Sequence, residues 1–221
     1  MMRSEITSPM KQLFILAVIG LLAGGCASTS DSGSKPASAA TTSGDGYTKD
    51  KDIQRVWLAP GFDFSGYDTL YIGPAKYAAK ERPNEVDMRT WAIKYLTTAY
   101  ADRIGTNKLF ANVTTREDDL KPGSKVLRME NTIYEYEKGG GGARYFVGLY
   151  GGGQPVIKVR GQFTDGEKTV CKYEAWRSGE SAGSRLAGVF MSDQNIQQED
   201  INDLAFDMSD FMLRTSRHVK K

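Results

Sequence analysis

Residues 154–177 read QPVIKVRGQFTDGEKTVCKYEAWR, and they carry the clearest strand pattern in the chain. Between residues 156 and 165 the side chains alternate between two faces, which is the pattern of a β-strand. Residues 165–168 (DGEK) follow as a hairpin turn signal, and residues 169–177 return as the partner strand. Because neighbouring strands joined by a short turn run antiparallel, the stretch predicts a mainly antiparallel sheet.

The returning strand can bury either of two faces, and the sequence leaves that choice open. Cys171 is interpreted as a small buried apolar residue of this strand. A thiol nucleophile needs a histidine or a cationic neighbour, and the only histidine, His218, belongs to the C-terminal tail. The two possible faces are Val170, Lys172, Glu174 and Trp176 on one side, and Thr169, Cys171, Tyr173 and Ala175 on the other.

Strand-like segments also precede the hairpin. Residues 125–138 (KVLRMENTIYEYEK) predict a second long strand. Residues 67–72 predict a first strand because they are rich in β-branched and aromatic side chains. Residues 109–115 predict a short strand, and residues 56–60 are interpreted as an apolar lead-in.

Two amphipathic helices complete the predicted domain. The first begins after a cap at Asn84 and ends at Gly105, which is a typical C-cap residue. A second helix follows from apolar residues at three- and four-residue spacing. We therefore predict an α+β fold, a mainly antiparallel β-sheet with two amphipathic helices packed on one face. The stripe of the second helix comprises Ile201, Leu204, Ala205, Met208, Phe211 and Met212.

The N-terminal region begins with a targeting signal. Residues 10–26 read MKQLFILAVIGLLAGGC: a lysine, a short apolar run, small residues and then Cys26. The apolar run is shorter than the roughly 20 residues that span a bilayer. The order resembles the bacterial lipoprotein signal, although Ala23 stands where the pattern usually has leucine. The resemblance implies that Cys26 becomes the lipidated first residue, anchored by acyl chains in the outer membrane because Ala27, and not aspartate, follows it.

The signal sets the expected domain organisation. We predict a signal peptide over residues 1–25 and a disordered linker, rich in Ser, Thr, Ala and Gly, over residues 26–52. A single α+β domain then covers residues 53–217, and residues 218–221 form a basic tail. The cations at the end of the chain are interpreted as a solvated helix end. They are Arg214, Arg217, His218, Lys220 and Lys221.

The most unusual internal feature is the glycine loop, residues 139–153 (GGGGARYFVGLYGGG). A phosphate-binding loop would need a lysine that is missing here. A helix–helix contact through Gly148 and Gly152 would need a longer apolar segment. Two alternatives stay open: an aromatic patch tucked over the sheet edge, or a patch offered to a partner or to the bilayer. The candidate interaction residues are Tyr145, Phe146, Val147, Leu149 and Tyr150.

Composition and motifs argue against several function classes. The formal net charge is +2, which gives no electrostatic footprint for nucleic acid. The predicted domain carries no histidine to activate a nucleophile and too few Cys or His residues for zinc. The many carboxylates form no recognisable pair for sugar cleavage. We therefore predict a non-enzymatic protein with no catalytic residue, no metal and no cofactor.

The element order, the glycine loop and the hairpin resemble the uncharacterised domain of proteobacterial envelope lipoproteins, over about residues 53–215. The resemblance implies an envelope location and carries no site. We expect a binding or scaffolding module that acts through the glycine loop on an envelope partner. The alternatives are a self-associating subunit of an envelope or secretion assembly, and a carboxylate-based cell-wall enzyme.

Overall fold

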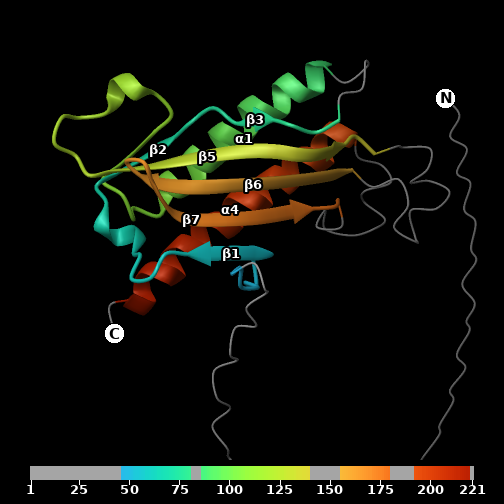
Figure 1. The fold of residues 1–221 in the computed structure, drawn as a ribbon. Helices are drawn as coiled ribbons and strands as arrows, with labels where there is room; N and C mark the ends of the chain where they lie inside the picture. Colours follow the sequence, from blue (N-terminus) through green and yellow to red (C-terminus); the bar gives the residue numbers. More distant parts are fainter. Residues whose placement is uncertain (1–45, 81–85, 140–154, 180–191, 220–221) are drawn as a thin grey trace, which may run out of the picture. The chain divides into compact units, whose positions relative to one another are not determined.

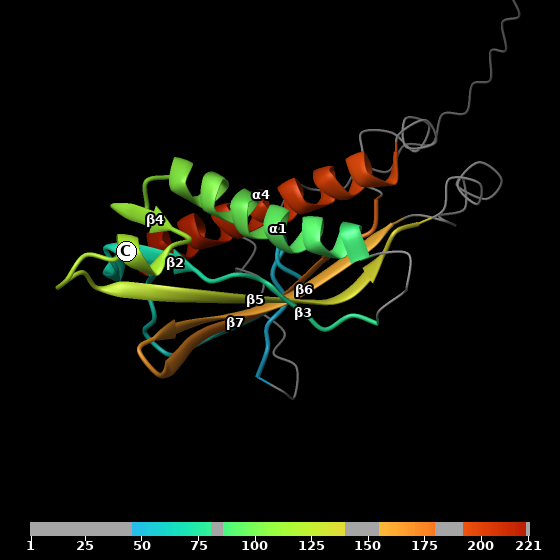
Figure 2. The ribbon, with the colours of Figure 1, turned by 90° about the horizontal axis from the view of Figure 1, so that it is seen from above.

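The computed structural model describes residues 46–80, 86–139, 155–179 and 192–219 of the 221-residue chain (Figure 1). In this part of the chain, seven strands form one sheet, and two long helices lie on one of its faces (Figure 2). The predicted α+β class and the placement of both helices on one face are confirmed. The signal peptide, Cys26 and residues 140–153 of the glycine loop lie outside the described residues.

The sheet is mixed but mainly antiparallel, as predicted. Strands β1, β7, β6 and β5 pair antiparallel in that order, whereas β2 is parallel to both β5 and β4, and β3 is parallel to β5. The parallel part was not predicted, and it arises because a helix crosses over between β2 and β4. The strands are β1 (Arg55–Leu58), β2 (Thr69–Ile72), β3 (Lys76–Tyr77), β4 (Asn112–Thr114), β5 (Val126–Glu137), β6 (Val156–Asp165) and β7 (Lys168–Arg177).

The hairpin of β6 and β7 forms as the sequence predicts. Its turn places Gly166 at a φ of 58°, a left-handed conformation that favours glycine. The structure also settles which face of β7 is buried, since Cys171, Tyr173 and Ala175 face the core. The predicted apolar lead-in at residues 56–60 is instead the edge strand β1, which pairs with β7.

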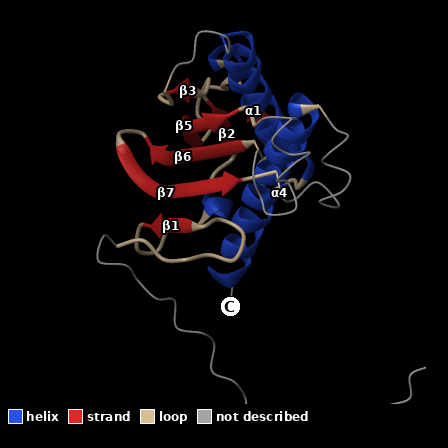
Figure 3. Ribbon diagram, turned by 90° about the vertical axis from the view of Figure 1, so that its right-hand side faces the viewer, coloured by secondary structure: helices blue, strands red, loops and turns tan. Residues whose placement is uncertain are grey.

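The helices α1 (Val86–Thr106) and α4 (Asp193–Val219) form the second layer (Figure 3). All six residues of the predicted apolar stripe on α4 are buried against the sheet. The prediction that Gly105 ends the first helix is wrong, because α1 continues through it to Thr106. The left-handed residue after the helix is Lys108, with a φ of 55°.

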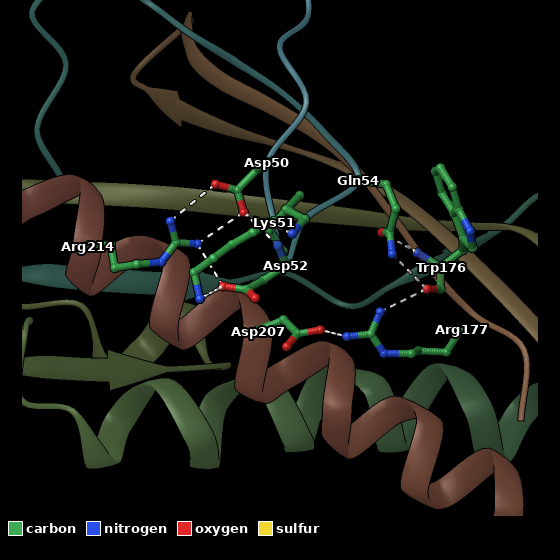
Figure 4. Close-up of polar contacts among 9 residues, drawn as sticks. Asp50, Lys51, Asp52, Gln54, Trp176, Arg177, Asp207 and Arg214 are labelled. Atoms are coloured by element: carbon green, nitrogen blue, oxygen red, sulfur yellow. Dashed lines mark hydrogen bonds and ion pairs between the residues drawn. The ribbon is translucent and has the colours of Figure 1, made fainter. Parts of the chain in front are cut away.

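The segment before β1 is part of the folded body. The backbone of Thr48 exchanges two hydrogen bonds with Val56, at 2.7 and 2.9 Å, and so pairs with the outer edge of β1. Asp50 and Asp52 both accept from the guanidinium of Arg214 on α4, at 2.8 to 3.2 Å (Figure 4). These contacts involve residues that the sequence analysis placed in the linker.

Candidate functional site

The face of the sheet opposite the helices is a candidate binding surface of the described residues. Both helices lie on the other side, so this face is seen directly in Figure 1 and edge-on in Figure 2. We call it the open face and define it by its outward-pointing side chains. These are Arg55 and Trp57 on β1, Lys172, Glu174 and Trp176 on β7, Lys158, Arg160 and Gln162 on β6, and Arg128, Glu130, Thr132 and Tyr134 on β5.

Strand register arranges these side chains in rows that cross the sheet. Residues directly opposite on neighbouring strands share a face and lie in contact range. One row runs Arg55, Glu174, Arg160 and Thr132, and the next runs Trp57, Lys172, Gln162 and Glu130. The open face therefore alternates cations with carboxylates and polar groups, with a tryptophan at the end of the second row.

A hollow of about 330 Å³ is lined by residues of both rows. The segment before β1 contributes to its wall through Tyr47, whose ring lies under the Arg55 guanidinium, 4.8 Å from its centroid. The lining is mostly polar and combines hydrogen-bond donors with acceptors. It consists of Tyr47, Glu130, Thr132, Arg160, Gly161, Gln162, Lys172, Tyr173 and Glu174.

The two carboxylates of the hollow are neutralised by cations from outside its lining. Glu174 pairs with Arg55 at 3.0 Å, and Glu130 pairs with Lys76 at 3.3 Å. Glu130 also accepts a hydrogen bond of 3.4 Å from the Gln162 amide. Neither carboxylate therefore depends on the cations that line the hollow.

The two cations of the hollow are held by aromatic rings instead. The Arg160 guanidinium lies 5.4 Å from the centroid of Tyr134, and the Lys172 ammonium lies 5.9 Å from the centroid of Trp57. Within the described ranges, no carboxylate lies within 4.0 Å of either cation. In the described part of the chain, the open face thus carries two positive charges that form no ion pair.

Under the open face, Gly161 and Tyr173 fit together closely. A Cβ atom at position 161 would lie 2.4 to 2.7 Å from three atoms of the Tyr173 ring. Tyr173 is 1% exposed, and its hydroxyl donates to the Asn131 side-chain oxygen. Burial raises the pKa of the Tyr173 hydroxyl well above its usual value, so it stays a neutral donor. The missing side chain at 161 is therefore what admits the ring.

Several residues singled out from the sequence lie elsewhere. Cys171 is a buried free thiol, as predicted for a core residue, and burial raises its pKa so that the thiol stays protonated. Arg214 is not a solvated cation, because it is fixed by Asp50 and Asp52. Cys26 and the candidate interaction residues Tyr145, Phe146, Val147, Leu149 and Tyr150 fall outside the described residues.

One further buried acid stands out at the N-terminal half of α4. Asp200 is 1% exposed and accepts a hydrogen bond of 3.0 Å from the Gly179 amide. Burial raises its pKa from 3.8 to about 7.

Neither α1 nor α4 is long and apolar enough to cross a bilayer. Among the described residues, no three His, Cys, Asp or Glu side chains are grouped to hold a metal.

Comparisons with known proteins assign no family. No protein-family model and no curated protein matches the chain. PelC from Paraburkholderia phytofirmans, solved as a dodecamer, is 10% identical over 69% of this chain and 96% of its own, with a TM-score of 0.42. Protein XCC0632 from Xanthomonas campestris is 11% identical over 74% and 93%, with a TM-score of 0.39. A putative neuraminyllactose-binding hemagglutinin homolog from Helicobacter pylori is 8% identical over 73% and 93%, with a TM-score of 0.35. These likenesses transfer no ligand, partner or activity to this chain.

The open face was not predicted from the sequence. Its signal is the alternation of residues 156–162, which places Lys158, Arg160 and Gln162 on one side of a strand. The approach of Trp57 to Lys172 depends on the pairing of β1 with β7 across more than a hundred residues. Alternation alone does not reveal that pairing.

Proposed function

We propose that the protein is a lipid-anchored, non-enzymatic binding module of the bacterial cell envelope, and that its open face receives the partner. The observation that carries the proposal is the one-sided cover of the sheet. Both helices pack on one face, while the other keeps aromatic rings and two cations that pair with no carboxylate among the described residues. A surface of this composition matches the enrichment of Trp, Tyr and Arg at binding interfaces.

The anchor in this proposal is Cys26, at the end of the lipoprotein-like signal. Two or more acyl chains hold a protein stably at a bilayer, whereas a single chain holds it only marginally. Ala27 after the cysteine favours the periplasmic side of the outer membrane. Intact-mass analysis of the membrane form should give an acylated chain that begins at Cys26. A Cys26→Ser variant should lose the acyl mass, and an unmodified thiol on the native product would contradict the anchor.

Two features of the described residues support a binding role over a catalytic one. The only described thiol is buried and kept protonated by its raised pKa. The carboxylates of the hollow, Glu174 and Glu130, are already paired with Arg55 and Lys76. The partner that we propose is an envelope component reached from the membrane surface.

Site-specific photocrosslinking in intact cells tests this function. A photoreactive residue at Gln162 of the open face should capture a partner. The same residue at Thr90, exposed on α1 and outside both hollows, is the matched control and should capture none. Capture only from Thr90 would move the binding surface to the helices and would contradict the proposal.

Self-association is the second candidate, and a specific feature favours it. The solvent side of α1 and α4 forms a hollow of about 420 Å³ in which Phe206 is 45% exposed. The Arg103 guanidinium lies 4.2 Å from the centroid of this ring. A Phe206→Cys variant should then form disulfide-linked dimers in the oxidising envelope. An Asp118→Cys variant, at a remote exposed site, should not form them.

A further inference from the structure

We propose that the open face binds an acidic glycan, a chain of sugars that carry carboxylates. This inference rests on the proposed function and specifies its ligand. Arg160 and Lys172 would take the carboxylates, while the polar lining of the hollow would take the hydroxyls.

The charge available on the open face depends on which of its groups are already paired. Glu174 and Glu130 are matched by Arg55 and Lys76, at 3.0 and 3.3 Å. Lys158, on the same face, is matched by Glu135 at 2.8 Å. Of the described cations that line the hollow, Arg160 and Lys172 have no such partner. The surface is therefore complementary to an anion, and two anionic groups would complete its ion pairs.

The strand register sets the spacing between Arg160 and Lys172. Arg160 lies opposite Glu174, and Gln162 lies opposite Lys172, so the two cations are diagonal neighbours on adjacent strands. Diagonal positions are separated by roughly 7–8 Å, within reach of long side chains. Both can therefore contact successive charged groups of one extended ligand. The rings of Tyr134 and Trp57 limit the freedom of the two cations before binding, which lowers the entropy cost of fixing them.

The chemistry of the lining favours a sugar over an anionic membrane surface. A hydroxyl both donates and accepts, and the hollow offers both kinds of partner through Gln162, Thr132 and the two glutamates. An anionic bilayer attracts uniformly cationic patches, at about 1 kcal/mol per basic residue near the surface. The glutamates Glu130 and Glu174 beside the cations would weaken that attraction, whereas they can accept hydrogen bonds from sugar hydroxyls.

Isothermal titration calorimetry with oligogalacturonate tests the inference. The detergent-solubilised mature protein is titrated with the oligosaccharide and with its methyl-esterified form, which keeps the sugar ring but has no charge. The expected result is binding of the acidic form only, weakened by added salt. Arg160→Gln and Lys172→Gln should each weaken binding about tenfold, as expected for loss of a charge-assisted hydrogen bond. Lys94→Gln is the matched control, because it removes a lysine charge from the exposed side of α1, away from the open face, and it should bind as the native protein does.

The outcomes separate the inference from the proposed function. Equal binding of the esterified form, or an equal loss with Lys94→Gln, would overturn the role of the two cations. Absence of binding to oligogalacturonate, or binding only in a parallel titration with vesicles that contain phosphatidylglycerol, would overturn the acidic glycan as the ligand. In each of these cases, crosslinking from Gln162 would still capture a partner if the open face is the binding surface. Loss of that crosslink would instead overturn the proposed function.

Discussion

Replacing Gly161 by alanine places a methyl group against a buried ring. The new Cβ would lie 2.4 Å from the nearest Tyr173 ring atom, about 1 Å short of ordinary contact at 3.4 Å. The ring has no free direction to move in, because Tyr173 is 1% exposed and its hydroxyl bonds the buried Asn131. The substitution therefore requires a shift of strand β7 and breaks the hydrogen bond between Tyr173 and Asn131.

The expected cost follows from these two terms. Inserting a methyl group into a well-packed core costs about 1–3 kcal/mol. A broken buried hydrogen bond adds about 1 kcal/mol or more. Alanine loses less backbone entropy on folding than glycine does, which offsets about 0.5–1 kcal/mol of this cost. We expect Gly161→Ala to lower the free energy of unfolding by about 2–3 kcal/mol.

Urea unfolding followed by tryptophan fluorescence measures this change, with the midpoint expected to fall at constant slope. Gly105→Ala is the matched control. A Cβ atom added at position 105 would have nothing within 4 Å, and alanine at this helical position should raise the free energy of unfolding by about 0.5–1 kcal/mol. In a Tyr173→Ala background, where the ring is absent, Gly161→Ala should cost nothing further. If the Gly161→Ala protein is as stable as the native one, or if the substitution costs the same in both backgrounds, the added methyl group does not clash with the Tyr173 ring.

Three further predictions concern α4. The pKa of Asp200 is raised from 3.8 to about 7, so its contribution to stability is complete below pH 3.8 and is lost as the pH rises through 7. The loss of stability is at most about 4 kcal/mol. Asp200→Asn should flatten the pH dependence of the unfolding midpoint between pH 3.8 and about 7. An unchanged pH profile in this variant would contradict a raised pKa of Asp200. Arg214→Met should lower stability by about 1–2 kcal/mol at low salt, because it leaves Asp50 and Asp52 without their cation, whereas Arg116→Met, in an exposed pair at 3.9 Å, should change it by less than about 0.5 kcal/mol. Leu204→Asp should abolish cooperative unfolding, because it puts a charge where the side chain is 0% exposed; a retained cooperative transition would contradict the packing of α4.

Local patterns were sufficient to predict the antiparallel part of the sheet. The turn at residues 165–168 and the alternation on either side of it specify a hairpin whatever the rest of the chain does. The apolar stripe of α4 likewise identified the face that packs on the sheet. These features are short-range, so their periods can be read from the sequence alone.

Long-range pairing was not predictable in the same way. The four residues of β1 give no clear period, and they become a strand because β7 supplies a partner. The parallel pairing of β2 with β5 and β4 depends on the path of α1, which residue spacing does not encode. The open face follows from both pairings together. The pairing of Asp50 with Arg214, 164 residues apart, was missed for the same reason.

Hydroxyl-radical footprinting in isolated envelopes and on the purified protein tests the central claim that the open face is the working surface. Trp176 on the open face is 37% exposed, and Phe206 on the helix face is 45% exposed, so each reports on one side of the domain. We predict that Trp176 is oxidised less in envelopes than in the purified protein, while Phe206 reacts equally in both. Protection of Phe206 with unchanged oxidation of Trp176 would contradict the account.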